Sequence, residues 1–305
     1  MTEIENQIVQ VAEECVMRWG TPDKKTASLS DKVTKWLCNA DTNQQKILLE
    51  LLKNFNYYSK ERTLGIFSEL LATYKKETSN FGYQVYTYIK SKTPIMNSSI
   101  NLLSEIYEYE GDIHKGSMII DISAYFEGKE NVKEIVLIDD FIGSGDTIIT
   151  YMNTNIVHLR GKKIVIIIIE ILDTTIGKIK EYCRDNGLEL DMFYHCKQVK
   201  AFTHNHIFKN EEVLNSKGII KALEINIWGK ENRNILGYAA SECLLAFWRN
   251  TPNNTLSAFW YEKDSTWKGV FPRKNEDIPQ FIKEVRYAKS QRRQRNYDVA
   301  RGVKK

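Results

Sequence analysis

One run, Glu134–Thr147, constrains the fold more than any other part of the sequence. Its first part, Ile135–Ile138, is apolar and mostly β-branched, which is typical of a parallel strand buried on both faces. Asp139 and Asp140 follow at the C-terminal end of this predicted strand, and in open α/β sheets ligands bind at that end. The run therefore predicts a strand that brings two carboxylates to a binding edge.

The turn that comes next, Gly143-Ser144-Gly145, consists of small residues and leaves the backbone open to an anion. A predicted helix over residues 146–158 follows, and its first free N–H groups and positive dipole end would face a phosphate. Two carboxylates beside a phosphate cradle suit a ligand with vicinal hydroxyls at one end and a phosphate at the other. The alternative is a buried strand that ends in two solvated acids before an ordinary helix cap.

Two other nucleotide-binding loops join a strand to a helix through glycines, and the sequence excludes both. A Walker loop ends in Gly-Lys-Ser or Gly-Lys-Thr, which is absent here. A Rossmann fingerprint needs a third glycine at a set offset and an acid after the loop, whereas here the acids come before it.

The order acid-acid-apolar-apolar-small-Ser-Gly-x-Thr resembles the phosphoribosyl pyrophosphate (PRPP) motif of type I phosphoribosyltransferases. The resemblance implies that Asp139 and Asp140 are the catalytic residues and bind the ribose 2′- and 3′-hydroxyls. It also implies that the 5′-phosphate is wrapped by Gly143, Ser144, Gly145, Asp146 and Thr147. Asp146 is a departure, because a carboxylate inside the loop repels a phosphate unless its side chain points away.

Alternating strands and helices surround the motif. Strands are predicted at 84–89, 117–122, 163–170 and 188–195, and helices at 100–109, 146–158 and 174–186. This alternation indicates an α/β fold with a parallel, doubly wound sheet, of the type I phosphoribosyltransferase kind by the resemblance above. Apolar residues at helical spacing predict an N-terminal helical region, with helices at 3–18, 31–39, 42–54 and 60–76. We expect three parts: a helical region 1–80, an α/β domain 81–275 and a basic tail 276–305.

Two further segments are candidates for binding. A polar basic loop with Lys90 and Lys92, followed by Ser98 and Ser99 at the start of a helix, is laid out like the pyrophosphate loop of the family. A surface loop with an ordinary serine cap fits it equally well. Downstream, a turn rich in Asn precedes several aromatic residues, and a base or acceptor pocket is predicted from Asn253, Asn254, Trp260 and Arg273. A purely structural aromatic cluster remains an alternative.

The motif and this downstream block together resemble the phosphoribosyltransferase-like domain of bacterial conflict systems, including effectors encoded beside retron reverse transcriptases. The resemblance implies an antiphage effector that binds PRPP or a nucleotide ribose-phosphate and acts at the ribose C1 bond. Magnesium is the implied cofactor, arriving with the ligand, and we expect no metal ligated directly by the protein. The second hypothesis is a catalytically silent module that senses a nucleotide or docks on a reverse transcriptase with its DNA.

Charge and hydropathy bear on the expected partners and cellular location of the protein. The formal net charge is +4, yet the segment 286–305 holds eight Lys or Arg and a single Asp. This basic tail could contact nucleic acid, or it could be a solvated end. The longest apolar run, Ile164–Ile169, is far shorter than the roughly 20 residues that cross a bilayer. Residues 1–18 carry four Glu and lack the pattern of a secretory signal, so we expect a cytoplasmic protein without membrane contact.

Overall fold

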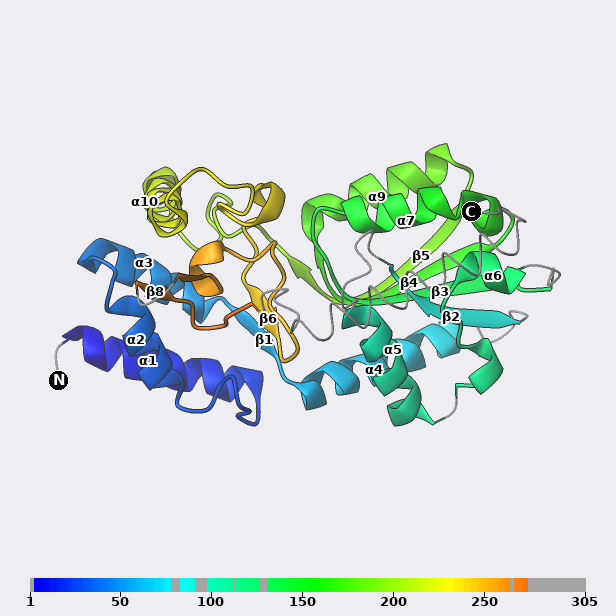
Figure 1. Cartoon of the computed structure of the whole chain (residues 1–305), viewed down its shortest axis with the longest axis horizontal. Coiled ribbons are helices and arrows are strands. Elements are labelled where there is room, and N and C mark those ends of the chain that lie inside the picture. The colour runs from blue at the N-terminus through cyan, green and yellow to red at the C-terminus, as the bar shows by residue number, and fades with distance from the viewer. Residues whose placement is uncertain are drawn as a thin grey trace, which may run out of the picture. The chain divides into compact units, whose positions relative to one another are not determined.

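A four-stranded parallel sheet carries the motif in the computed structural model (Figure 1). Its strand order is β2-β3-β4-β5, with β2 (Gln84–Tyr88), β3 (Glu134–Ile142), β4 (Lys163–Leu172) and β5 (Glu189–Gln198). The structure describes residues 3–77, 83–90, 98–111, 113–126, 131–263 and 266–273. Contacts divide the chain into a unit Met1–Arg273 and a unit Lys274–Lys305, and the second lies outside the described residues.

The central strands are as apolar as the sequence predicts. In β4 every residue after Lys163 is buried, and in β3 the first five residues are buried. Both faces of these strands are covered, which explains why β-branched residues run continuously instead of alternating with polar ones.

Helices cover both faces of the sheet. One face packs against α4 (Lys60–Glu77) and α5 (Ser98–Glu110). The other face packs against α6 (Ile122–Phe126), α7 (Asp146–Thr154), α8 (Ile156–Leu159) and α9 (Asp173–Asp185). The predicted doubly wound α/β architecture is therefore confirmed. The single helix predicted over 146–158 is broken, because the backbone at Asn155 leaves the helical region between α7 and α8.

The direction of winding reverses between β2 and β3. After α5 and the short 3-10 helix η1 (Lys115–Ser117), Met118 forms a parallel bridge with Tyr86, and Ile119 N donates to Tyr86 O at 2.9 Å. Since β3 occupies one edge of β2, this bridge lies on the other edge, and the chain then crosses by α6 to reach β3. Such a reversal opens a crevice at the carboxyl ends of the two strands.

The prediction of a strand at 117–122 is wrong. Only Met118 bridges to the sheet, and the Asp121 carboxylate accepts a hydrogen bond from Ser123 N at 3.0 Å, which caps α6 and ends the extended segment. Ile120 is 65% exposed, so its β-favouring side chain has no second sheet face to bury it.

A second hydrophobic cluster joins the two ends of the described chain. Its N-terminal part contains α1 (Glu3–Trp19), α2 (Leu29–Leu37) and α3 (Thr42–Lys53), so the predicted helical region is confirmed. Its C-terminal part contains α10 (Asn210–Trp228), η3 (Ser257–Phe259) and β8 (Trp267–Lys268), and Figure 1 shows α10 and β8 beside the blue helices. The same part of the chain also forms η2 (Tyr238–Ala240) and β7 (Glu262–Lys263).

This cluster is built from rings and buried hydrogen bonds. Trp36 stacks obliquely on Phe259 with ring centroids 4.8 Å apart, and its Nε1 donates to Ala258 O at 2.8 Å. A two-stranded parallel pair, β1 (Asn56–Tyr58) with β6 (Leu245–Phe247), lies between this cluster and the helix α4. The boundaries proposed from the sequence, at residues 80 and 275, stay a prediction.

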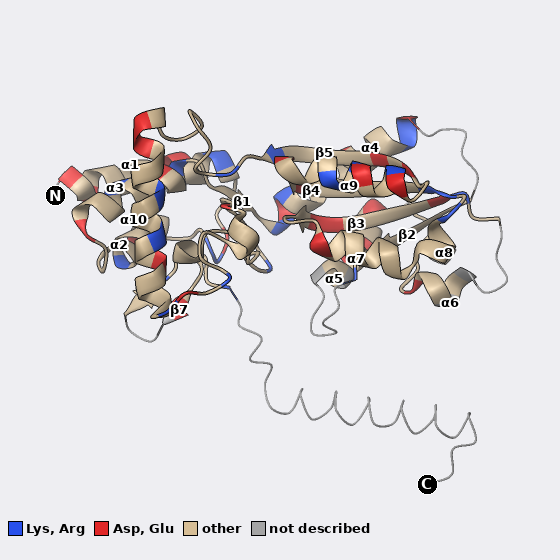
Figure 2. Ribbon diagram, turned by 90° about the horizontal axis from the view of Figure 1, so that it is seen from above, with Lys and Arg blue, Asp and Glu red and all other residues tan. Residues whose placement is uncertain are grey.

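Charged side chains of both signs are interspersed over the described helices and strands (Figure 2). No helix among the described residues is long and apolar enough to span a bilayer.

Candidate functional site: a braced anion loop beside two acids

The loop after β3 has the backbone that an anion site needs. Gly145 is the N-cap of α7 with φ +80°, a conformation that glycine adopts without strain, and no side chain caps the helix there. Among the described residues, the N–H groups of Ser144 and Gly145 have no hydrogen-bond acceptor. The N-terminal end of α7 therefore presents unsatisfied donors, as an anion-binding loop does.

Both glycines are required by close neighbours. A Cβ on Gly145 would lie 2.7 Å from Thr175 Cγ2, and a Cβ on Gly143 would overlap the side chain of Asn254. The loop is thus packed against α9 on one side and against the Asn-rich turn on the other.

Helix α9 braces the carbonyl side of the loop. Thr175 Oγ1 donates to Gly143 O at 2.5 Å, and Lys178 Nζ donates to Ser144 O at 3.0 Å. With these carbonyls bonded to α9, the loop's N–H groups are left for other acceptors. No sequence motif marked Thr175 or Lys178, although their spacing of three places them on one helix face.

Asp146 does not leave an unpaired charge in the loop. Its Oδ1 lies 2.8 Å from Lys178 Nζ, and Ser144 Oγ donates to its Oδ2 at 3.0 Å. The hydrogen bond from Lys178 lowers the pKa of this carboxyl, so it stays ionised and paired. The conflict that the sequence raised at this position is resolved by a lysine from another element.

The two acids lie inside β3, which continues to Ile142 beyond the predicted end of the strand. Ser99 Oγ, from the first turn of α5, donates to Asp139 Oδ1 at 2.7 Å, and Asp140 N donates to the same oxygen at 2.9 Å. Burial, together with repulsion from Asp140, raises the pKa of Asp139 well above its usual range. Burial also raises the pKa of Asp140 to about 6.

Arg249 is a site residue that the sequence analysis missed. Its charge offsets a small part of the rise that burial causes in the pKa of Asp140. Its guanidinium pairs with Glu105 of α5 and lies 4.5 Å from the ring centroid of Trp248. Lys60 pairs with the same Glu105 at 3.2 Å. This cluster, Lys60, Glu105, Trp248 and Arg249, places more positive than negative charge on the α5 side of the acids. The available signal was a cation directly before the predicted Asn-rich turn.

The structure places the candidate pyrophosphate loop only in part. Lys92 and the side chain of Ser98 lie outside the described residues. Lys90 pairs with Asp121 at 3.7 Å, and Ser99 reaches Asp139 as given above.

Of the candidate base pocket, the structure brings Asn254 to the loop. Its amide nitrogen donates to Ser241 Oγ at 3.1 Å, while among the described residues no group donates to its Oδ1. The backbone oxygen of Asn253 accepts from Tyr238 N at 2.8 Å. Trp260 is 4% exposed with its Nε1 bonded to Thr255 O, and the Arg273 guanidinium lies 5.9 Å from the Trp260 ring centroid. Their predicted role in base recognition stays a prediction.

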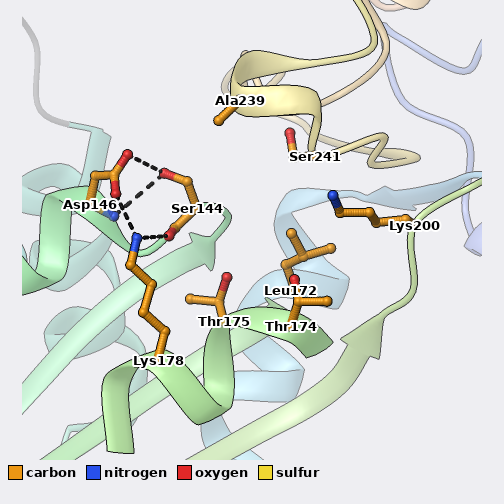
Figure 3. A pocket seen from close by; sticks show the side chains of 9 residues that line it. All are labelled: Ser144, Asp146, Leu172, Thr174, Thr175, Lys178, Lys200, Ala239 and Ser241. Carbon is orange, nitrogen blue, oxygen red and sulfur yellow. Dashed lines mark hydrogen bonds and ion pairs between the residues drawn. The ribbon is translucent and has the colours of Figure 1, made fainter. Parts of the chain in front are cut away.

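A cavity of about 300 Å³ opens beside the loop (Figure 3). Loop residues and the start of α9 form one wall, and Lys200 and the η2 segment form the other. It is lined by Ser144, Asp146, Leu172, Thr174, Thr175, Lys178, Lys200, Ala239 and Ser241. In the described part of the chain, no group of three or more His, Cys, Asp or Glu side chains is placed to hold a metal ion.

A doubly wound parallel sheet with a glycine loop and two adjacent acids at its carboxyl edge defines an α/β protein of phosphoribosyltransferase-like type. The family model PRTase-CE matches residues 33–273, and the chain belongs to the PRTase-CE family. Among solved structures, Helicobacter pylori xanthine-guanine-hypoxanthine phosphoribosyltransferase is similar over 39% of this chain and 78% of that chain, at 16% identity and a TM-score of 0.29. That similarity is weak. A comparison with curated proteins finds no match.

Proposed function

We propose that the protein binds the ribose 5-phosphate part of PRPP or of a nucleotide and acts at the ribose C1 bond. The observation that carries the proposal is the α9-braced loop, in which the N–H groups of Ser144 and Gly145 have no acceptor among the described residues. The loop follows Asp139 and Asp140 in the same strand-turn-helix unit. The family match supports a phosphoribosyl ligand. The 5′-phosphate would lie on residues 143–147 and the α7 N-terminus, with the ribose hydroxyls on the two carboxylates.

Magnesium fits this site as a companion of the ligand. Asp139 and Asp140 are adjacent carboxylates, and both have pKa values raised by burial, so a cation would relieve the cost of ionising them together. Mg²⁺ is commonly held by one or two carboxylates with substrate phosphates and water. When bound, it would supply charge neutralisation for the pyrophosphate.

The chain's own residues would act mainly by positioning. In phosphoribosyl transfer the C1–O bond breaks with its electron pair on pyrophosphate, and an acceptor lone pair forms the new bond at C1. The transition state carries positive charge on the sugar, so fixed carboxylates and an oriented ribose lower its free energy. Ser99 would hold Asp139 in place, and the Asn254 Oδ1 is available to accept a hydrogen bond from the acceptor.

A phosphorus NMR time course of PRPP with magnesium and candidate acceptors tests the reaction. We expect pyrophosphate to appear with the wild-type protein and not with Asp139→Asn/Asp140→Asn. Asp31→Asn, which changes an exposed carboxylate on α2, is the matched control and should keep wild-type turnover. Equal turnover in the double variant would overturn the proposal.

The biological setting we propose is antiphage defence in the cytoplasm, as an effector of the kind found beside retron reverse transcriptases. The support for this setting is the sequence resemblance. Plaque counts on cells that express the whole system should rise to the undefended level when Asp139→Asn/Asp140→Asn replaces the wild type. Protection unchanged by that double variant would contradict an effector role for this site.

A second candidate function is supported by the basic tail. Eight Lys or Arg against one Asp in 286–305 suit salt-sensitive contacts with nucleic acid, such as the DNA of a reverse transcriptase complex. In that case the ribose-phosphate site would sense a nucleotide without turning it over. Ligand binding without pyrophosphate release from any acceptor would favour this candidate.

A further inference from the structure

The cavity beside the loop contains a cation that the proposed ribose-phosphate site does not use. Lys200 follows β5 and is half-buried, and its amino group points into the cavity in Figure 3. Among the described residues no acceptor contacts this amino group. A half-buried ammonium group facing a cavity is a place where an anion gains a charge-assisted hydrogen bond.

The rest of the lining favours a negative ligand as well. Asp146 and Lys178 neutralise one another at 2.8 Å, so Lys200 sets the net charge of the cavity wall. Thr174 and Thr175 belong to the first turn of α9, which no side chain caps, so its N–H groups add a positive end to the same wall. None of the described residues that line the cavity is aromatic, which makes it unlike a pocket that stacks a base.

The opposite wall is a strained segment held in place from several sides. Ala239, Ala240 and Glu242 all have φ between +50° and +57°, a left-handed conformation that costs free energy for residues other than glycine. Glu242 Oε1 lies 2.5 Å from Lys217 Nζ, and Ser241 Oγ donates to Tyr238 O at 2.7 Å. Strain retained by such bonds is a feature of functional sites.

We propose that this cavity is a second anion site that takes the phosphate monoester of the acceptor, held by Lys200. The proposal rests on the proposed function, because an acceptor has meaning only if ribose phosphate occupies the loop. A volume of about 300 Å³ lies at the lower end for ligand pockets and accommodates a phosphate with part of a nucleoside. The phosphate could belong to a mononucleotide or to the 5′-end of an oligonucleotide.

Calorimetry on protein saturated with ribose 5-phosphate and magnesium tests this site. The titrants are adenosine, adenosine 5′-monophosphate, and one single-stranded oligonucleotide with and without a 5′-phosphate. We expect at least one phosphorylated titrant to bind roughly tenfold tighter than its unphosphorylated form, and Lys200→Ala to abolish that difference. Lys180→Ala, on the exposed side of α9, is the matched control and should keep it. The oligonucleotide and mononucleotide arms show which source of phosphate is preferred.

The two proposals fail in different ways. If the wild-type protein does not bind ribose 5-phosphate, the proposed function is contradicted. If ribose 5-phosphate binds but no phosphorylated titrant is preferred, or if Lys200→Ala keeps the preference, the second anion site is wrong. Lys200→Ala should bind ribose 5-phosphate as the wild type does, which separates a local effect from misfolding.

Discussion

Asp140 should make stability depend on pH in the absence of ligand. Its pKa is raised to about 6 in the folded protein, so between about pH 4 and 6 the folded state keeps a proton that the unfolded state has lost. The free energy of unfolding should therefore fall as pH rises through this window, by about 1–2 kcal/mol after allowance for partial exposure. Urea denaturation at pH 4.5 and 7 measures it.

Asp140→Asn removes the titrating carboxyl and is the variant that tests this account. It should be more stable than the wild type at pH 7 and similar to it at pH 4.5. Asp31→Asn on the exposed face of α2 should keep the wild-type profile. A parallel pH profile for Asp140→Asn and wild type would contradict the raised pKa.

The contact between Gly143 and Asn254 gives a second test at the residue scale. Gly143→Ala places a Cβ inside the Asn254 side chain, and overpacking of this kind costs about 1–3 kcal/mol. Asn254→Gly removes the obstructing side chain, so Gly143→Ala/Asn254→Gly should recover much of that loss. A double-mutant cycle by urea denaturation measures the coupling, and additive effects of the two changes would show that the contact does not exist.

The residues of the candidate site form two groups: those positioned by neighbours in the sequence and those positioned by long-range contacts. Asp139, Asp140 and the loop glycines are set by local order along one strand-turn-helix unit, so the sequence predicts them. Arg249, Lys178 and Lys200 come to the same edge of the sheet from other elements. Local sequence patterns do not predict that these three residues lie near the motif. Thus the residues of the glycine loop could be picked out from the sequence, whereas the cations that lie beside it could not.

At the scale of elements, Glu170 ties β4 to the β1–β6 pair. It is fully buried, and it accepts hydrogen bonds from Asn56 Nδ2 at 2.6 Å and from the Tyr58 hydroxyl. Burial raises its pKa to about 7, so the folded state holds the proton between about pH 4.5 and 7 while the unfolded state does not. Stability should fall by about 2–3 kcal/mol as pH rises through that window.

Glu170→Gln keeps an acceptor for Asn56 and Tyr58 but cannot ionise. Thermal denaturation should show that this variant loses about 2–3 kcal/mol less stability than the wild type between pH 4.5 and 7. Glu61→Gln, on the exposed side of α4, should lose as much as the wild type. A pH-dependent loss in Glu170→Gln as large as that of the wild type would contradict the raised pKa of Glu170.

The sequence predicts helix or strand correctly for segments whose apolar residues are buried. The continuous β-branched segments of β3 and β4 and the amphipathic helices α1–α4 form as predicted, because their apolar faces have sheets or helices to cover them. The segment 117–122 has equally good strand propensity, but at the edge of β2 it forms a single β-bridge, between Met118 and Tyr86. Propensity without a neighbouring strand was insufficient there.

At the scale of the whole molecule, the described unit should fold without the basic tail. The hydrophobic clusters of the described residues end at Phe271, and Met1–Arg273 forms a compact unit. Deletion of 274–305 should leave the melting temperature within about 2 °C, the change expected for less than 1 kcal/mol. Differential scanning fluorimetry measures it, and a larger drop would show that the tail stabilises the unit.

The same deletion tests nucleic-acid binding by the tail. Fluorescence anisotropy with labelled single-stranded DNA should show salt-sensitive binding by the full chain and little binding by the truncated one. A full-length variant with the eight Lys and Arg of residues 286–305 changed to Gln should behave like the deletion.

The packing of distant segments against one another was the part of the fold that the sequence predicted least. Residues 8–57 and 201–271 share one hydrophobic cluster, and residues from the second segment, including Ala239, Arg249 and Asn254, complete the site at the sheet edge. The sequence of each segment, taken alone, predicts only an amphipathic or aromatic-rich stretch. Their pairing depends on long-range packing, which periodicity does not encode.

Calorimetry of ribose 5-phosphate with magnesium tests the central claim most directly. The wild-type protein should bind, and Asp139→Asn/Asp140→Asn should bind at least tenfold more weakly with an unchanged circular dichroism spectrum. The reason is that each change removes a negative charge and replaces one acceptor oxygen with an NH2 donor, while the loop remains. Asp31→Asn should bind as the wild type does. Equal binding by the double variant and the wild type, or no binding by either, would contradict a ribose-phosphate site at this edge of the sheet.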